Sequence, residues 1–384
     1  MISLTNYLSR NFVLIVAGLL LFGGCGGSKE SARREFHPRE TKFPIAVFPI
    51  ENLTGTAAPL EEVRKSLILQ LNAGGFQVLE EEVLARFMAR NRVRFIGGID
   101  SETAQALKKE TGAEGVLITS LELYSEANPP KIGLTSRLVS TGENPSILWI
   151  DGVGLAGDDS PGFLGLGLVE DPKDLLKRAI ESITGGLGKY LSAGEEREDI
   201  KKARRKFQPK SFYRSEVIVP EKKYTIAIIP FFNRSDRKYA GEIMTLHFVK
   251  EMKKFSEFEI IELGVVRKQL LTLRVVMEEG ISIAQTEALL STLFADLVLT
   301  GRVMDYQDYQ GTYGTPKVDF SAQLIERKSR MVIWSSISYN RGDDGVFFFD
   351  RGRVNTAYAM TSQMIQSIGE KLLKGKKSEK PLSP

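Results

Sequence analysis

The fold is decided by a short stretch that occurs twice, as FPIAVFPIEN at Phe43–Asn52 and as YTIAIIPFFN at Tyr224–Asn233. Each stretch is apolar, rich in β-branched residues, and ends in a proline followed closely by an asparagine. Such a run is typical of a buried strand followed by a turn, because proline has no N–H to donate to a neighbouring strand. The repetition predicts that one α/β unit is present twice in the chain.

The segments that follow the two stretches also match. In the first copy, Leu60–Ala73 carries apolar residues on one helical face, and two glycines end the helix before a predicted strand at Phe76–Leu79. Two further helices are predicted in the first copy, at Glu82–Arg90 and Ser101–Thr111. The second copy has a predicted helix at Ile243–Met252, a strand at Phe258–Ile261, and helices at Val265–Leu273 and Ser282–Phe294.

Each copy then continues with three strands and a long helix. The predicted segments are Ala113–Thr119, Lys131–Ser140, Ser146–Val153 and the helix Asp174–Leu191 in the first copy, and Ala295–Gly301, Lys317–Glu326, Met331–Tyr339 and the helix Asn355–Leu373 in the second. The last strand of each hairpin contains a tryptophan, Trp149 or Trp334. Turn-forming residues between the strands are typical of hairpins.

These patterns predict an α/β protein made of two tandem copies of a three-layer-type α/β domain with a mixed sheet, preceded by a lipoprotein signal peptide. The predicted divisions are a signal peptide at 1–24, a polar tether at 25–42, a first domain at 43–193, a charged linker at 194–222, a second domain at 223–374 and a disordered tail at 375–384.

The first residues have the order of a secretory signal. A polar segment with Arg10 precedes the apolar run Phe12–Phe22, and two glycines and Cys25 follow. As a helix the run would span roughly 16 Å, whereas a bilayer core needs about 30 Å, so a stable transmembrane anchor is disfavoured. Cys25 is the single cysteine of the chain. We therefore expect it to be lipidated rather than to be a buried thiol that merely follows an apolar run.

Composition narrows the possible functions. The 384 residues carry a formal net charge of +4 with 26% charged side chains, which gives no reason to expect a nucleic-acid partner. One cysteine and two histidines, His37 and His247, do not supply the ligand set of a structural zinc. We expect no metal, no cofactor and no small-molecule substrate.

The glycine-rich segment Gly152–Gly167 lacks the GxxxxGK[ST] order of a phosphate-binding loop. Its apolar residues fit either a mobile surface loop or a partner-contact or self-assembly loop, the second being the interpretation that we prefer, and a run of three phenylalanines occupies the matching place in the second copy. The predicted partner-contact residues are Phe163, Leu164, Leu166, Phe347, Phe348 and Phe349.

Several polar motifs contain residue types that can serve as catalytic groups. Asp158-Asp159 and Asp343-Asp344 recur after the hairpins, but neighbouring residues of an extended chain face opposite ways, which favours solvated turns over an acid–base pair or a calcium site. His247 has no accompanying nucleophile motif and is predicted to be structural or on the surface. Tyr306 and Tyr309 fit either a contact surface or two strand ends. No catalytic residue is predicted, and we expect that the protein is not an enzyme.

The repeated pattern resembles a group of bacterial envelope proteins. The runs IAVFPIENLTG, GFQVLEEEVL and TGAEGVLITSLELY, with the tryptophan-bearing hairpin, are similar to those of the CsgG-like curli-secretion lipoproteins, the amino-terminal domain of TolB and the penicillin-binding-protein activator lipoproteins. The resemblance covers most of Phe43–Leu191 and Tyr224–Leu373. It implies a docking domain rather than a catalyst, and the sequence around Cys25 resembles a lipobox.

The resemblance also implies a location. Gly26 stands where aspartate favours the inner membrane in enteric lipoproteins, which implies a palmitate-bearing protein anchored on the outer membrane and facing the periplasm. The expected function is non-catalytic docking or assembly of envelope components, through an envelope partner or self-association. The alternative is an oligomeric CsgG-like secretion component. Charged residues in the hairpins, such as Arg137 and Asp319, disfavour a membrane-inserted pore.

Overall fold

The structure is a computed structural model that describes residues 43–159, 167–193, 207–219, 222–275, 281–309, 314–346 and 352–373. Residues 43–193 are called the first half below, and residues 207–373 the second half. The elements of the first half are β1 (Ile45–Val47), β2 (Glu51–Asn52), α2 (Leu60–Ala73), α3 (Glu81–Arg90), α4 (Ser101–Thr111), β3 (Gly115–Ser125), β4 (Lys131–Ser140), β5 (Ile147–Ala156) and α5 (Pro172–Ala193).

The second half repeats this order with two differences. It has an additional strand at its start, β6, and a strand after its first helix, β9, where the described part of the first half has none. Its elements are β6 (Ser211–Arg214), β7 (Tyr224–Ile228), β8 (Phe232–Asn233), α6 (Ala240–Lys253), β9 (Phe258–Ile260), α7 (Leu263–Thr272), α8 (Ile283–Thr292), β10 (Leu297–Gln307), β11 (Lys317–Glu326), β12 (Val332–Arg341) and α9 (Ala357–Leu373).

Both sheets are mixed, which confirms the predicted α/β class. The first sheet has the order β1-β3-β4-β5, with β1 parallel to β3 and the other neighbours antiparallel, and β2 extends β1 along β3. The second sheet has the order β6-β12-β11-β10-β7-β9 with the same directions at its shared positions. In each half a register shift precedes the hairpin tryptophan, which pairs with Leu138 in one half and with Leu324 in the other.

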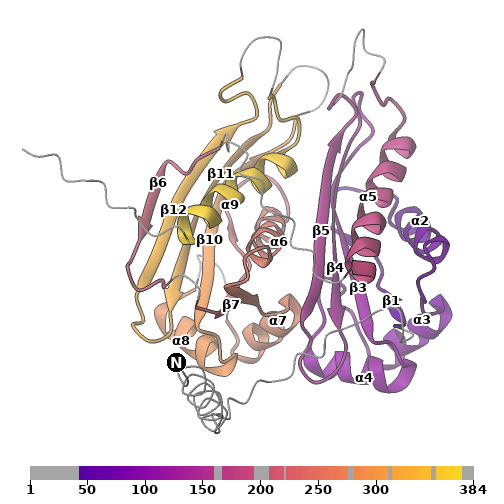
Figure 1. Cartoon of the computed structure of the whole chain (residues 1–384), viewed down its shortest axis with the longest axis horizontal. Helices are drawn as coiled ribbons and strands as arrows, with labels where there is room; N and C mark the ends of the chain where they lie inside the picture. Colours follow the sequence, from indigo (N-terminus) through magenta and orange to yellow (C-terminus); the bar gives the residue numbers. More distant parts are fainter. Residues whose placement is uncertain are drawn as a thin grey trace, which may run out of the picture. The chain divides into compact units, whose positions relative to one another are not determined.

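Both faces of the first sheet are covered by helices, which pack against it through their apolar residues. In the first half, α2 and α5 bury Val63, Leu67 and Ile180 against one face of the first sheet (Figure 1). The helices α3 and α4 lie on the other face through Leu84 and Leu107. The remaining part of that second face is covered by α6 and α9 of the second half. The described residues between 43 and 373 therefore belong to one compact unit.

Two segments differ from the sequence prediction. Residues 194–222 were expected to be a charged linker, for which no strand was named, and the structure places β6 in this range, paired with β12 at the edge of the second sheet (Figure 1). Phe76–Leu79 was expected to be a strand, but it makes only a single bridge between Val78 and Ile45. The strand β6 has only four residues of mixed polarity, which is too short a pattern to identify a strand without knowing its partner. None of the helices in the described ranges combines the length and hydrophobicity that a bilayer-spanning segment requires.

Candidate functional site

The residues that the sequence selected as functional lie outside the described ranges. Cys25 precedes residue 43, and the six predicted partner-contact residues fall within 160–166 and 347–351. The residues that the structure brings together are a set of polar side chains that the sequence did not select. They lie between the two halves, where the outer face of the first sheet meets α6, α7 and α9.

An ion pair between Arg137 and Glu262 joins the two halves. Neither side chain has any exposed area, and Arg137 Nη2 and Nε donate to Glu262 Oε1 and Oε2 at 3.2 and 3.3 Å. Such a two-point contact has the geometry that arginine and carboxylate favour. Because both charges are removed from water, each depends on the other for its solvation.

Glu262 also fixes the local backbone. It is the N-cap residue of α7, and its Oε1 accepts the N–H of Gly264 and the N–H of Ile99 in the first half, each at 3.4 Å. A Cβ placed on Gly98 would lie 2.6 Å from the nitrogen of Gly264. The two halves therefore approach through their backbones at this point, which requires glycine.

A second buried cluster surrounds His247 of α6. Its Nε2 lies 3.3 Å from Glu122 Oε2 of β3, and its Nδ1 lies 3.2 Å from the hydroxyl of Ser362. Burial lowers the pKa of the His247 imidazole, and the neighbouring Glu122 carboxylate raises it by less. The histidine is therefore neutral near pH 7 and is structural, one of the two roles that the sequence allowed.

Tyr358 of α9 presses against the first sheet beside this cluster. Its hydroxyl lies 2.9 Å from Thr135 Oγ1 and accepts a hydrogen bond from Lys250 Nζ at 3.0 Å. A side chain on Gly152 or Gly154 of β5 would overlap Tyr358. These two glycines of the predicted loop segment therefore allow a helix of the second half to rest on the first sheet.

Further contacts extend the polar surface along the whole junction. Arg237 Nη2 donates to the backbone oxygen of Glu122 at 2.6 Å. Lys131 Nζ donates to the backbone oxygen of Tyr309 at 2.8 Å and lies 3.2 Å from the centre of its ring. Burial lowers the pKa of the Lys131 ammonium, and Asp308 nearby opposes this effect. Tyr309, which the sequence left between two roles, thus contacts the first half.

The aspartate pairs are parts of turns, as expected. Asp159 Oδ2 accepts the N–H of Ala156 at 2.7 Å, and Asp344 Oδ2 accepts the N–H of Arg341 at 2.9 Å. Asn355 Nδ2 donates to both Asp158 and Asp159, at 3.3 and 3.2 Å, and adds another contact between the halves. In the described ranges, no group of three or more histidine, cysteine or carboxylate side chains is arranged to hold a metal ion.

The corresponding face of the second sheet is covered by α7 and α8 over β7 and β10, but in the described ranges it is exposed over β6 and β12. Counting from the two matching tryptophans, Ile337 corresponds to Gly152 and Tyr339 to Gly154. Ile337 is 51% exposed and Tyr339 57% exposed, and Tyr213 of β6 is exposed on the same face. The face that the second half covers in the first sheet thus carries large apolar side chains in the second.

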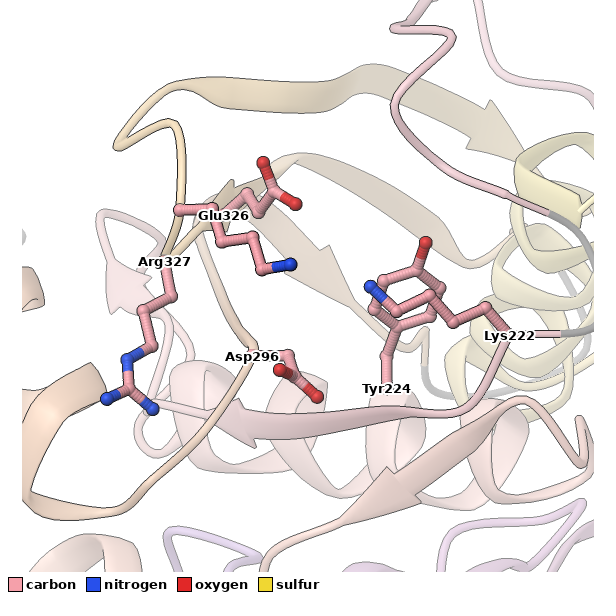
Figure 2. Close-up of a pocket in the computed structure, with 6 residues that line it drawn as sticks. Lys222, Tyr224, Asp296, Glu326 and Arg327 are labelled. Carbon is pink, nitrogen blue, oxygen red and sulfur yellow. The ribbon is translucent and has the colours of Figure 1, made fainter.

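A shallow pocket of about 250 Å³ lies at the end of the second sheet where β7 and β10 begin. In Figure 2, Lys222 lies along the ring of Tyr224, and Asp296 lies between these residues and Arg327, whose guanidinium points away. Asp296 Oδ2 accepts the N–H of Thr225 at 3.1 Å, so this carboxylate caps the strand. The volume is smaller than that of a typical ligand site, and the lining charges are of both signs.

Comparison with known proteins gives structural likenesses only. No protein-family model matches the chain, and no curated protein sequence matches it. A PelC dodecamer subunit from Paraburkholderia phytofirmans has 12% identity over 43% of this chain and 97% of its own, with a TM-score of 0.30. Lipoprotein GNA1162 from Neisseria meningitidis has 19% identity over 38% and 98%, with a TM-score of 0.28.

A third likeness is to the LpoB C-terminal domain from Escherichia coli. It has 14% identity over 30% of this chain and 82% of the other, with a TM-score of 0.23. All three TM-scores are well below 0.5 and every identity is below 25%, so these similarities carry no conclusion about function.

Proposed function

We propose that the protein is a lipid-anchored, non-catalytic docking module of the bacterial envelope, built from two tandem copies of one α/β domain. The observation that carries the proposal is the open outer face of the second sheet, with Ile337, Tyr339 and Tyr213 exposed. Exposed apolar side chains grouped on a flat sheet are typical of a surface that binds protein. The same face of the first sheet buries its side chains against α6 and α9.

The polar residues support docking rather than catalysis. Arg137, Glu262 and His247 are each at most 1% exposed, and each is engaged in holding the two halves together. Catalysis requires such groups at a site that a substrate reaches. Their role here is to hold the two halves in contact.

The membrane anchor rests on the sequence. Cys25 follows a signal-like apolar run, and the resemblance to envelope lipoproteins implies acyl chains on this cysteine and an outer-membrane position facing the periplasm. Two or more acyl chains are enough for stable anchoring. Anchoring would raise the local concentration of the docking face near membrane-bound partners.

Co-purification from detergent-solubilised membranes tests this function. The Ile337→Asp/Tyr339→Ser variant should lose most of the co-purifying envelope protein while retaining the unfolding midpoint, because both side chains are exposed. Leu271→Asp, which changes a 61% exposed residue of α7, is the matched control and should recover the partner normally. Equal recovery with both variants would exclude this face as the docking surface.

The alternative is an oligomeric secretion component. The halves pack head to tail, since the second places its helices on the sheet of the first, and repetition of such a contact between chains gives rings or filaments. However, the Gly152 and Gly154 that receive Tyr358 are replaced by Ile337 and Tyr339 in the open sheet. The same packing would therefore clash. A light-scattering mass of more than about six subunits would favour the alternative, and a monomer would exclude it.

A further inference from the structure

The two sheets differ at one edge. In the second sheet, β6 pairs with β12 in antiparallel register, with Trp334 opposite Arg214 and Ser336 opposite Phe212. In the first sheet, β5 occupies the position of β12 but is the terminal strand of its sheet in the described ranges. Ser146, before β5 begins, makes a single bridge to Ile261 of the second half. Within the described ranges, the edge of β5 from Trp149 onwards therefore has no paired strand, whereas the matching edge of β12 pairs with β6.

The two matching tryptophans differ in burial because of this difference in strand pairing. Trp334 is fully buried, and the ring of Phe212 lies edge-on to it with 6.2 Å between the ring centres. Trp149, at the matching position of β5, is only half-buried. On α5, Gly186 lies against Trp149, and beside it Gly185 has open space where a Cβ would project. Two glycines inside a helix lower its stability, and a Cβ on Gly186 would lie 2.9 Å from Asp151 Oδ2 and 3.4 Å from Trp149 Cζ2, so α5 approaches β5 closely here.

The backbone groups of β5 that face this edge follow from the pairing in the second sheet. Ser215 donates to the backbone oxygen of Ile333, and Lys210 to that of Ile337, so β12 presents alternate residues to β6. The matching residues of β5 include Ile150 and Gly152. Asp151 Oδ1 accepts the N–H of Gly152 at 2.7 Å, a common form of protection for an exposed edge.

We infer that the outer edge of β5 binds an extended segment of a partner protein by strand addition, in the way that β6 occupies β12. Strand addition supplies affinity through the main chain and specificity through alternate side chains. The segment runs antiparallel to β5 and carries an aromatic residue opposite Asp151 and a basic residue opposite Trp149, as Phe212 and Arg214 do in β6. The basic residue then lies over the indole ring and diagonal to the Asp151 carboxylate.

A synthetic peptide with the sequence QPKSFYRSEV of residues 208–217 is the probe, added to the full mature chain with Cys25→Ser. In the second half, β6 itself is retained because it is part of the same chain. Saturable binding is expected, with slower hydrogen exchange at the Ile150 amide and reduced acrylamide quenching of Trp149. Replacing the phenylalanine of the peptide by alanine should weaken binding by roughly tenfold.

Two N-methylated peptides form a matched pair. The N–H of Tyr213 faces β12 by the alternation that Ser215 defines, and the N–H of Arg214 points away. Methylation at the tyrosine should abolish binding, whereas methylation at the arginine should preserve it. Absence of saturable binding, equal effects of the two methylations, or an Ile150 amide that is protected until residues 26–42 are removed would each overturn the inference.

The inference deepens the proposed docking function and rests on it for its biological use, but the two fail separately. If Ile150→Pro, which removes an edge N–H, leaves partner recovery from membranes unchanged while Ile337→Asp/Tyr339→Ser abolishes it, the docking function stands and the β5 edge is not its site. If Ile150→Pro alone abolishes recovery without lowering the unfolding midpoint, the edge is the site of docking.

Discussion

Arg137 of the first half and Glu262 of the second half form a two-point ion pair in which neither side chain is exposed. The pair connects β4 of the first half to the start of α7 in the second. Glu262 also accepts the N–H of Ile99 in the first half and the N–H of Gly264 in the second, so it contacts the backbone of both halves.

Removing one partner should be costly. Arg137→Met should lower the free energy of unfolding by about 3–5 kcal/mol, because the Glu262 carboxylate remains buried without a counter-charge. Arg137→Met combined with Glu262→Gln should lose less, since the amide oxygen can still accept from Gly264 and Ile99. Lys268→Met, which breaks the exposed pair with Glu102 at 3.1 Å, should cost below about 1 kcal/mol. Urea titration measures all three, and equal losses for Arg137→Met and Lys268→Met would contradict the assignment.

The stability of the protein should depend on His247 in mildly acidic solution. Burial lowers the pKa of its imidazole in the folded state, so the unfolded chain binds more protons below its ordinary pKa of about 6.5. The free energy of unfolding should therefore fall as the pH falls below this value, by up to about 1.4 kcal/mol per pH unit. Titrations between pH 5 and 8 should show the slope in the parent and in His37→Gln. A His247→Gln variant with the same slope would refute this origin.

The glycines of β5 and α5 should respond in opposite directions. Gly154→Ala should lower the free energy of unfolding, since the new methyl group would overlap Tyr358 and overpacking typically costs about 1–3 kcal/mol. Gly185→Ala should raise it by about 0.5–1 kcal/mol, because that helical position has open space and alanine loses less backbone entropy. Thermal unfolding of both variants checks the signs. Destabilisation by Gly185→Ala would show that the space next to Gly185 is already occupied.

The anchor should depend on a single residue. Cys25→Ser should move the protein from the membrane fraction to the soluble periplasmic fraction, since it removes the only cysteine of the chain and with it the acyl chains. Fractionation with metabolic labelling by palmitate measures both effects, and Ser28→Ala serves as the control in the tether. A Cys25→Ser protein that remains in the membrane fraction would show that the anchor is elsewhere.

Much of each half could be predicted from the sequence. The apolar runs at Ile45–Val47 and Tyr224–Ile228, the helix Ser101–Thr111 and both hairpins follow from periodicity and turn residues, because these signals are local. The matching of Trp149 with Trp334 followed from the repeat. The predicted contact residues Phe163 and Phe347 lie outside the described ranges, so their role stays a prediction.

The sequence by itself determined the mixed α/β class and most of the order of elements in the two halves, since each depends on neighbouring residues, and it predicts a lipidation signal at Cys25. Only the tertiary structure decided which polar residues are buried. Arg137 lies in a strand that reads as part of a hairpin, yet it has no exposed area because Glu262, far along the chain, covers it. The tertiary structure also decided that β6 pairs with β12 in one sheet while β5 is the terminal strand of the other sheet within the described ranges, because strand pairing depends on residues that are distant in sequence.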